Sequence, residues 1–281
     1  MNKFLFLFCL LFSCWASAEI AFPDQEKQNY YRDQDVEVSL GKAKSGDAEA
    51  QYLVGSAYLL GLESQDVEVD YEKAFCWLSR SANQGIAEAQ YELGRMYRYG
   101  LGVDKNGKKW EEYTSQAGEQ GLLSAYGDLM DVYREGDRDL GIDENGEKYF
   151  YWLERSAEAG HALSMVNMSI SYRYGYNVEV DVDKSFEWLM QAVEQDDLMA
   201  QGLAGEYFER GLGTEKDLVM AYMMYDLGGT GRNPEKQAVA EKMTDEQIQE
   251  AVSRSRQWQE EHNNIRPSYY GLEHQEDGSY R

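Results

Sequence analysis

The sequence has few of the residues from which disulfide frameworks and metal sites are built. Only three cysteines and three histidines occur in 281 residues. No spacing of histidine and cysteine fits a zinc site, and neither common type of phosphate-binding glycine loop is present. We therefore expect no metal, no cofactor, no catalytic residue and no small-molecule substrate.

Basic charge and long apolar runs are also scarce. The chain carries 27 lysines and arginines against 51 acidic residues, a formal net charge of −24. Such a field repels nucleic acid and anionic membrane surfaces, which excludes a nucleic-acid partner. No apolar run approaches the roughly 20 residues that a spanning helix needs, so no membrane span is expected.

The first 18 residues resemble a secretory signal peptide. A positive charge at Lys3 precedes the apolar run Phe4–Phe12, and Ala16 and Ala18 are small residues at the cleavage positions. This pattern predicts cleavage after Ala18 and a periplasmic or secreted protein. The alternative is a lipoprotein anchored through Cys14, for which Phe12 is a poor residue two positions earlier.

Cleavage would leave a strongly acidic chain with a single cysteine. It removes Cys9, Cys14 and, of the 27 basic residues, Lys3, so 26 basic and 51 acidic residues give a net charge of −25. Without a second cysteine there is no internal disulfide, and stability must come from packing. Cys76 directly precedes Trp77, and we expect it to be a small buried hydrophobe rather than a reactive thiol.

What the sequence does contain is a repeat. A glycine follows an aromatic residue by three positions five times, at intervals of 36 or 39 residues. A small residue lies eight positions before each aromatic, and in three of the units a glycine lies three positions before it. Such periodicity indicates stacked helical hairpins, in which small residues let neighbouring helices approach. The five pairs are Tyr58–Gly61, Tyr97–Gly100, Tyr133–Gly136, Tyr172–Gly175 and Phe208–Gly211.

The variation in length lies in one loop of each unit. The first and third units have three additional residues between their helices, at Glu63–Val69 and Asp137–Gly141. Insertions confined to one loop leave the helix stack intact. Two motifs that hint at calcium loops, Asp104–Gly107 and Asp143–Gly146, lack the expected glycine and glutamate positions, so turn and capping chemistry explains them better.

The motif from Ala87 to Gly94, followed by Tyr97–Gly100, resembles the Sel-like repeat (SLR), a relative of the tetratricopeptide repeat. The resemblance covers about residues 33–262 and implies an all-α fold, a right-handed α/α solenoid of helical hairpins with terminal capping helices. The expected organisation is a signal peptide (1–18), an N-terminal segment and capping helix (19–46), five hairpins (47–85, 86–121, 122–160, 161–196 and 197–232), C-terminal capping helices (233–263) and a flexible tail (264–281).

In such solenoids the first helices line the concave face, and the register predicts which side chains point into it. Arginine occupies one equivalent position in three consecutive units, as Arg98, Arg134 and Arg173. One hypothesis is that this ladder recognises an acidic or C-terminal segment of a partner. The alternative is that the arginines pair with nearby carboxylates. The predicted partner-binding residues are Arg95, Arg98, Tyr99, Arg134, Arg173, Tyr174 and Arg210.

These features favour a protein or peptide partner. We expect an exported, non-enzymatic scaffold or adaptor that binds its partner on the concave face. A second hypothesis is a periplasmic inhibitor or immunity protein that masks a toxic enzyme, because an acidic surface suits a basic target. A hydrolase is a remote third, since no constellation of residues supports it.

Overall fold

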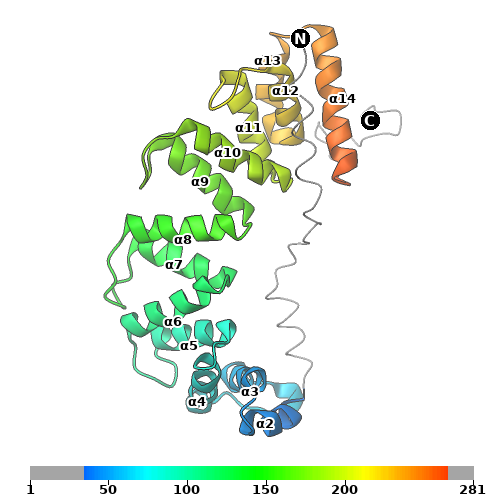
Figure 1. Ribbon diagram of the computed structural model, residues 1–281. Coiled ribbons are helices and arrows are strands. Elements are labelled where there is room, and N and C mark those ends of the chain that lie inside the picture. The colour runs from blue at the N-terminus through cyan, green and yellow to red at the C-terminus, as the bar shows by residue number, and fades with distance from the viewer. Residues whose placement is uncertain (1–34, 265–281) are drawn as a thin grey trace. The chain divides into compact units, whose positions relative to one another are not determined.

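The computed structural model describes residues 35–264, and within them every regular element is helical. The predicted signal peptide and the tail from residue 265 lie outside the described residues. Within this range the chain divides into two compact units: residues 35–89 together with Leu101–Val103, and Gln90–Gly100 together with residues 104–264. Consecutive helices pack as hairpins (Figure 1), which confirms the predicted all-α repeat fold.

The elements alternate between the first and second helices of each hairpin. The first unit contains α2 (Val36–Lys44), α3 (Ala48–Leu60), η1 (Glu63–Gln65) and α4 (Tyr71–Ala82). Helix α5 (Ala87–Tyr99) then leads into the second unit. The helices that follow are α6 (Gly107–Glu119), α7 (Leu123–Glu135), α8 (Gly146–Glu158), α9 (Ala162–Tyr174), α10 (Val182–Glu194), α11 (Leu198–Arg210), α12 (Leu218–Leu227), η2 (Thr230–Arg232), α13 (Asn233–Ala240) and α14 (Asp245–Glu261).

Each second helix begins at a side-chain cap. An Asp or Asn side chain accepts a hydrogen bond from a backbone N–H of the first turn, which satisfies a donor that the helix itself leaves unpaired. The two motifs that hinted at calcium loops supply two of these caps, so their capping interpretation is confirmed. The five capping residues are Asp70, Asn106, Asn145, Asp181 and Asp217.

The same backbone bond closes every hairpin. The N–H of the capping residue donates to the carbonyl of the repeated aromatic, at 2.8 Å from Asp70 to Tyr58 and at 2.7 Å from Asn145 to Tyr133. The longer loops of the first and third hairpins each contain one isolated β-bridge, Leu62 with Val67 and Asp137 with Ile142. The inserted residues therefore extend the loop without changing how the two helices meet.

Left-handed residues end the second helices. Gly85, Gly121 and Gly160 have φ angles of 92°, 90° and 95°, a region that residues with a Cβ rarely adopt. In the fourth hairpin Asp196 occupies the position that glycine holds in the three preceding hairpins, and it takes the same role with φ 59°. The chain reversals after the first four second helices therefore occur at left-handed residues.

The small residues of the first helices mark the points of closest helix approach. A Cβ atom added to Gly205 would lie 2.5 Å from the ring of Tyr225, and one added to Gly55 would lie 2.7 Å from Leu78. Contacts below 3.0 Å leave no room for a methyl group. The repeated small position therefore sets how closely the first and second helices pack.

A buried ion pair holds the C-terminal helices together. The Lys236 ammonium on α13 lies 2.8 Å from the Asp226 carboxylate on α12, and both side chains are almost fully buried. Ser255 of α14 donates to the second oxygen of Asp226 at 2.6 Å. A capping box is present at the start of α14, where the side chains of Thr244 and Gln247 each accept a hydrogen bond from the other's backbone N–H.

One sequence-based expectation was wrong. Cys76 is exposed, because Ala74 and Leu78 form the buried stripe of α4 and a residue two positions from each lies on the opposite side of the helix. In the second hairpin the fully buried large side chain of the second helix is Trp110.

Candidate partner-binding surface

All seven predicted binding residues lie near the C-terminal ends of first helices in the second unit. These residues occupy equivalent positions in successive repeats, so the repeat register places them on one face, which we call the first-helix face. The first hairpin differs from the others. Its residue at the position of Arg98, Arg134 and Arg173 is Leu59, which is buried, whereas the next residue, Leu60, is exposed. The residues are Arg95, Arg98 and Tyr99 on α5, Arg134 on α7, Arg173 and Tyr174 on α9, and Arg210 on α11.

Arg98 is shared between two carboxylates. Its guanidinium lies 3.7 Å from Asp128 on α7 and 3.4 Å from Asp137, and the side chain is only 20% exposed. The same group stacks over the ring of Trp110 at 5.5 Å and over that of Tyr99 at 5.7 Å. Arg98 therefore links neighbouring repeats while it contacts the side chain that follows it in sequence.

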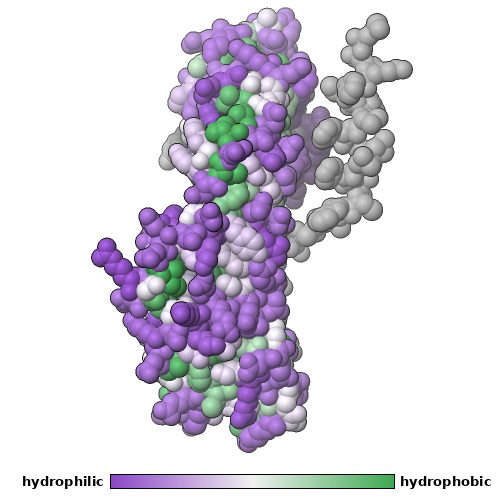
Figure 2. Space-filling view, turned by 60° about the vertical axis from the view of Figure 1, so that its left-hand side comes forward, coloured by the Kyte–Doolittle hydropathy of each residue, from purple (hydrophilic) through white to green (hydrophobic). Residues whose placement is uncertain are grey.

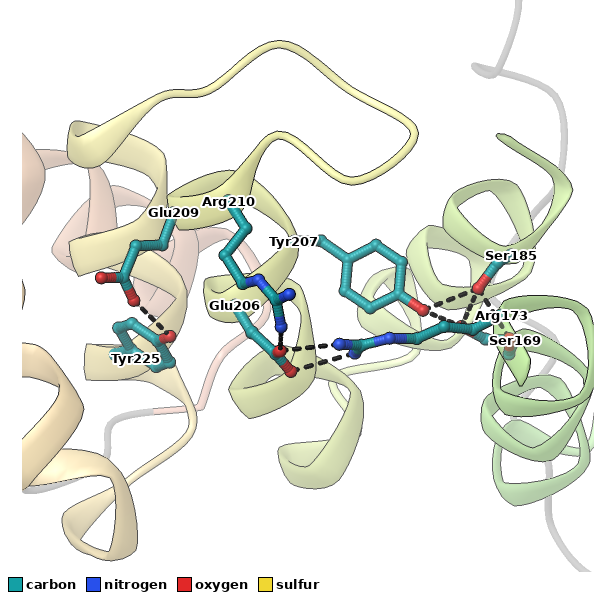
Figure 3. Close-up of polar contacts among 8 residues, drawn as sticks. All are labelled: Ser169, Arg173, Ser185, Glu206, Tyr207, Glu209, Arg210 and Tyr225. Atoms are coloured by element: carbon teal, nitrogen blue, oxygen red, sulfur yellow. Dashed lines mark hydrogen bonds and ion pairs between the residues drawn. The ribbon is translucent and has the colours of Figure 1, made fainter. Parts of the chain in front are cut away.

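Arg173 makes the strongest pair on the face. Its two terminal nitrogens donate to the two oxygens of Glu206 on α11 at 3.0 and 2.7 Å, the bidentate geometry that favours arginine (Figure 3). Arg210 donates to the same carboxylate at 2.5 Å. The hydrogen bond from Arg173 lowers the pKa of Glu206, and burial partly opposes this shift.

The remaining arginines pair within their own helices. Arg134 lies 2.9 Å from Asp131 and 3.1 Å from Glu135, with its side chain about half exposed. Arg95 pairs with Glu92 at 3.1 Å, and burial nonetheless raises the pKa of that carboxyl. Pairing with nearby carboxylates, the alternative considered from the sequence, is thus the arrangement that the side chains adopt.

Glu209 replaces the ladder arginine in the fifth unit. Its carboxylate accepts from the Tyr225 hydroxyl at 3.1 Å (Figure 3) and lies 2.7 Å from the Lys242 ammonium. The hydrogen bond from Lys242 is the largest cause of the lowered pKa of Glu209. At this position, too, the charged group has a nearby partner of opposite sign. Here the first helix supplies the carboxylate and the partner is a lysine.

A buried network of hydroxyl groups contacts Arg173 through the ring of Tyr207. Ser185 donates to the backbone oxygen of Ser169 at 2.6 Å and bonds the Tyr207 hydroxyl at 2.6 Å (Figure 3). The Arg173 guanidinium lies over the Tyr207 ring at 5.1 Å. Ser169 stands where three of the other hairpins have glycine. Its partners lie 16 and 38 residues away, so no local signal could reveal them.

Two aromatic side chains project from this face. Tyr99 and Tyr174 are each more than half exposed, and each lies against the arginine that precedes it. Figure 2 shows one face of the molecule, on which apolar side chains gather in small clusters on a largely hydrophilic surface. Exposed apolar groups surrounded by polar ones are a common feature of protein interaction sites.

The described residues show neither a metal centre nor a membrane segment. In residues 35–264 no three His, Cys, Asp or Glu side chains are placed to hold a metal ion. Within the same range, no helix has the length and apolar character that crossing a bilayer would require.

The geometry of repeated hairpins agrees with a family comparison. The model of the Sel1 repeat matches residues 48–86, 87–122, 125–161, 162–197 and 198–230, more than half of the chain. The chain belongs to the Sel1 repeat family. Sel1 repeats typically mediate protein–protein interactions and are in general non-catalytic scaffolds. No curated protein matches the sequence.

Solved structures share this fold. A Sel1 repeat protein from Oxalobacter formigenes is 24% identical with a TM-score of 0.54, covering 74% of this chain and 59% of that chain. A protective antigen of uropathogenic Escherichia coli with an SLR fold is 24% identical with a TM-score of 0.45, covering 80% of this chain and 56% of that one. This chain therefore spans less than two thirds of either protein.

A third similar structure is an immunity protein from Pseudomonas aeruginosa. It is 17% identical with a TM-score of 0.34, and the match covers 73% of this chain and 81% of that chain. At this level of similarity it carries no argument about the function of the present chain.

Proposed function

We propose that this chain is an exported, non-catalytic scaffold that binds a protein or peptide partner on its first-helix face. The observation that carries the proposal is the pairing of Arg98 with Tyr99 and of Arg173 with Tyr174. In both pairs a carboxylate-anchored arginine lies against an exposed tyrosine ring, at 5.7 and 5.1 Å. The family membership supports a binding role in general, and the face supports this location.

Anchored aromatic side chains are suited to binding. Tyrosine and arginine are enriched among the residues that dominate interface energetics. A ring already held in one orientation loses less conformational entropy on binding than a free one, which favours affinity. Because Arg98 and Arg173 are themselves fixed by carboxylates, the proposed role of the ladder is to hold these rings in place as well as to contact the partner.

Site-specific photo-crosslinking tests this proposal. A benzophenone amino acid at position 99 or 174 should give a discrete adduct with one partner in living cells. Tyr151, a similarly exposed tyrosine on the second helix α8, is the matched control and should give none. The joint change Tyr99→Ala and Tyr174→Ala should abolish recovery of the crosslinked partner. Equal crosslinking from position 151 would contradict the proposed face.

Export is the second part of the proposal, and it rests on the leader-like residues 1–18. N-terminal sequencing of the protein from its native cells should give Glu19 as the first residue. A lipid-modified Cys14 would support the lipoprotein alternative, and an intact Met1 in a cytoplasmic fraction would refute export.

A further inference from the structure

The first turn of α11 presents apolar side chains to solvent. Leu198 and Met199, the first two residues of the helix, are 48% and 50% exposed. Met199 and Leu203 lie on the same side of α11 as Arg210, because these three residues are separated by four and seven positions. We call Leu198, Met199 and Leu203 the α11 patch. It lies at the end of the helix opposite to Arg210.

Among the first helices, the patch is particular to α11. The positions of Met199 and Leu203 include at least one polar residue in every other first helix. The equivalent pairs are Glu49 and Leu53 on α3, Glu88 and Glu92 on α5, Ser124 and Asp128 on α7, and Leu163 and Asn167 on α9. The stacking of the repeats therefore does not require two apolar side chains here.

The residues that the structure describes end beside this patch. Asn264 follows α14, and its side-chain amide donates to the carboxylate of Asp196, two residues before the start of α11. Asp196 also accepts a hydrogen bond from the side chain of Gln201 on α11, at 2.7 Å. The chain beyond Asn264 therefore starts next to the first turn of α11.

The composition and length of the next eight residues suit this surface. Four of the residues 265–272 have large apolar or aromatic side chains, and one is charged. Eight extended residues span about 28 Å at most, whereas a 13-residue helix such as α11 is about 20 Å long. The segment is therefore long enough to cover the whole α11 patch. The four residues are Ile265, Tyr269, Tyr270 and Leu272.

Charge favours the same placement. The turn before α11 contains three carboxylates in four residues, Glu194, Asp196 and Asp197. Arg266 lies two residues after Asn264, so its positive charge is attracted to this turn. Residues 273–281 contain three further carboxylates, which the same turn repels. The apolar segment is thus the part of the chain that fits beside α11.

We propose that residues 265–272 dock on the α11 patch of their own chain and cover Leu198 and Met199. Removing these side chains from water provides the driving force. A segment tethered beside its site has a high effective concentration there, which favours docking within the chain over docking on a second copy. The proposal replaces the expected flexible tail with a docked segment over these eight residues. It goes beyond the proposed function and requires no partner.

Hydrogen exchange measured by mass spectrometry on the whole purified protein tests the docking. The amides of residues 265–272 should exchange at least tenfold more slowly than in an isolated peptide of residues 265–281. The double variant Leu198→Asp with Met199→Asp should lose this protection, because it places two carboxylates on the patch. Aspartate is favourable in the first turn of a helix, so α11 should remain folded, and circular dichroism checks this.

A matched double variant controls for the loss of exposed apolar residues. Val38→Asp with Leu60→Asp changes two exposed apolar side chains of the first compact unit and should leave residues 265–272 protected. Exchange as fast as in the isolated peptide, or protection that persists in the α11 variant, would overturn the proposal. Protection that disappears on about hundredfold dilution would assign the segment to a second copy and overturn docking within the chain. None of these results depends on the crosslinking test of the proposed function.

Discussion

Replacing a glycine by alanine should have opposite effects at two positions of the first helices. Gly205 on α11 faces the buried ring of Tyr225, and an added Cβ would lie 2.5, 2.6 and 2.9 Å from three ring atoms. Gly127 on α7 has no such neighbour within 4 Å. Both glycines lie inside helices of the second unit, so the intrinsic helix preference of the new alanine is the same in both variants.

The magnitudes follow from two competing effects. Alanine in place of a helical glycine stabilises by about 0.5–1 kcal/mol. Overpacking a well-filled contact costs about 1–3 kcal/mol. Gly127→Ala should therefore gain about 0.5–1 kcal/mol, whereas Gly205→Ala should lose about 1–2 kcal/mol, because the buried Tyr225 ring has little space into which to move.

Urea unfolding followed by far-ultraviolet circular dichroism measures both changes. The midpoint should rise for Gly127→Ala and fall for Gly205→Ala relative to the unchanged protein, with similar slopes. Equal midpoint shifts in the two variants would refute the view that the repeated small residue is required by close helix approach.

Three further predictions concern the rest of the chain. Lys236→Met leaves the Asp226 carboxylate buried without its cation and should cost about 3–5 kcal/mol, measured by urea unfolding together with earlier proteolysis in α13 and α14; unchanged protection would contradict it. Glu206→Gln should cost about 1 kcal/mol at neutral pH. Because Arg173 lowers the pKa of Glu206, this difference should decline as pH falls below the ordinary glutamate pKa of about 4.3 and vanish only below the lowered pKa of Glu206; a constant difference would exclude the ion pair as its source. Cys76 should react with a thiol reagent in the folded protein without denaturant, and protection until unfolding would show that it is buried after all.

The repeat made most of the fold predictable. A period of 36 or 39 residues placed the helices, the turn glycines and the loops that lengthen, because each hairpin uses the same local chemistry. The capping residues Asn106 and Asn145 and the left-handed Gly121 were interpretable one by one, since caps and turns depend on residues adjacent in sequence. The exposed position of Cys76 was not foreseen, because the apolar residues around it do not show from the sequence alone which side of the helix is buried.

The candidate surface was predictable in position and only partly in chemistry. Register alone brought Arg98, Arg134 and Arg173 to equivalent positions. Their partners depend on side-chain reach across neighbouring helices, as in the pair of Arg173 with Glu206, 33 residues further on. A sequence pattern shows an arginine and a glutamate at separate positions but not the bond between them.

The sequence by itself determined the repeat, the helical fold class and the equivalent positions that the arginines occupy in it, because these follow from periodicity and from interactions within a few residues. Only the tertiary structure decided that the arginines are already paired and that the tyrosines beside them are the exposed groups. The physical reason is that burial and ion pairing depend on distances between segments that become neighbours only when the hairpins stack.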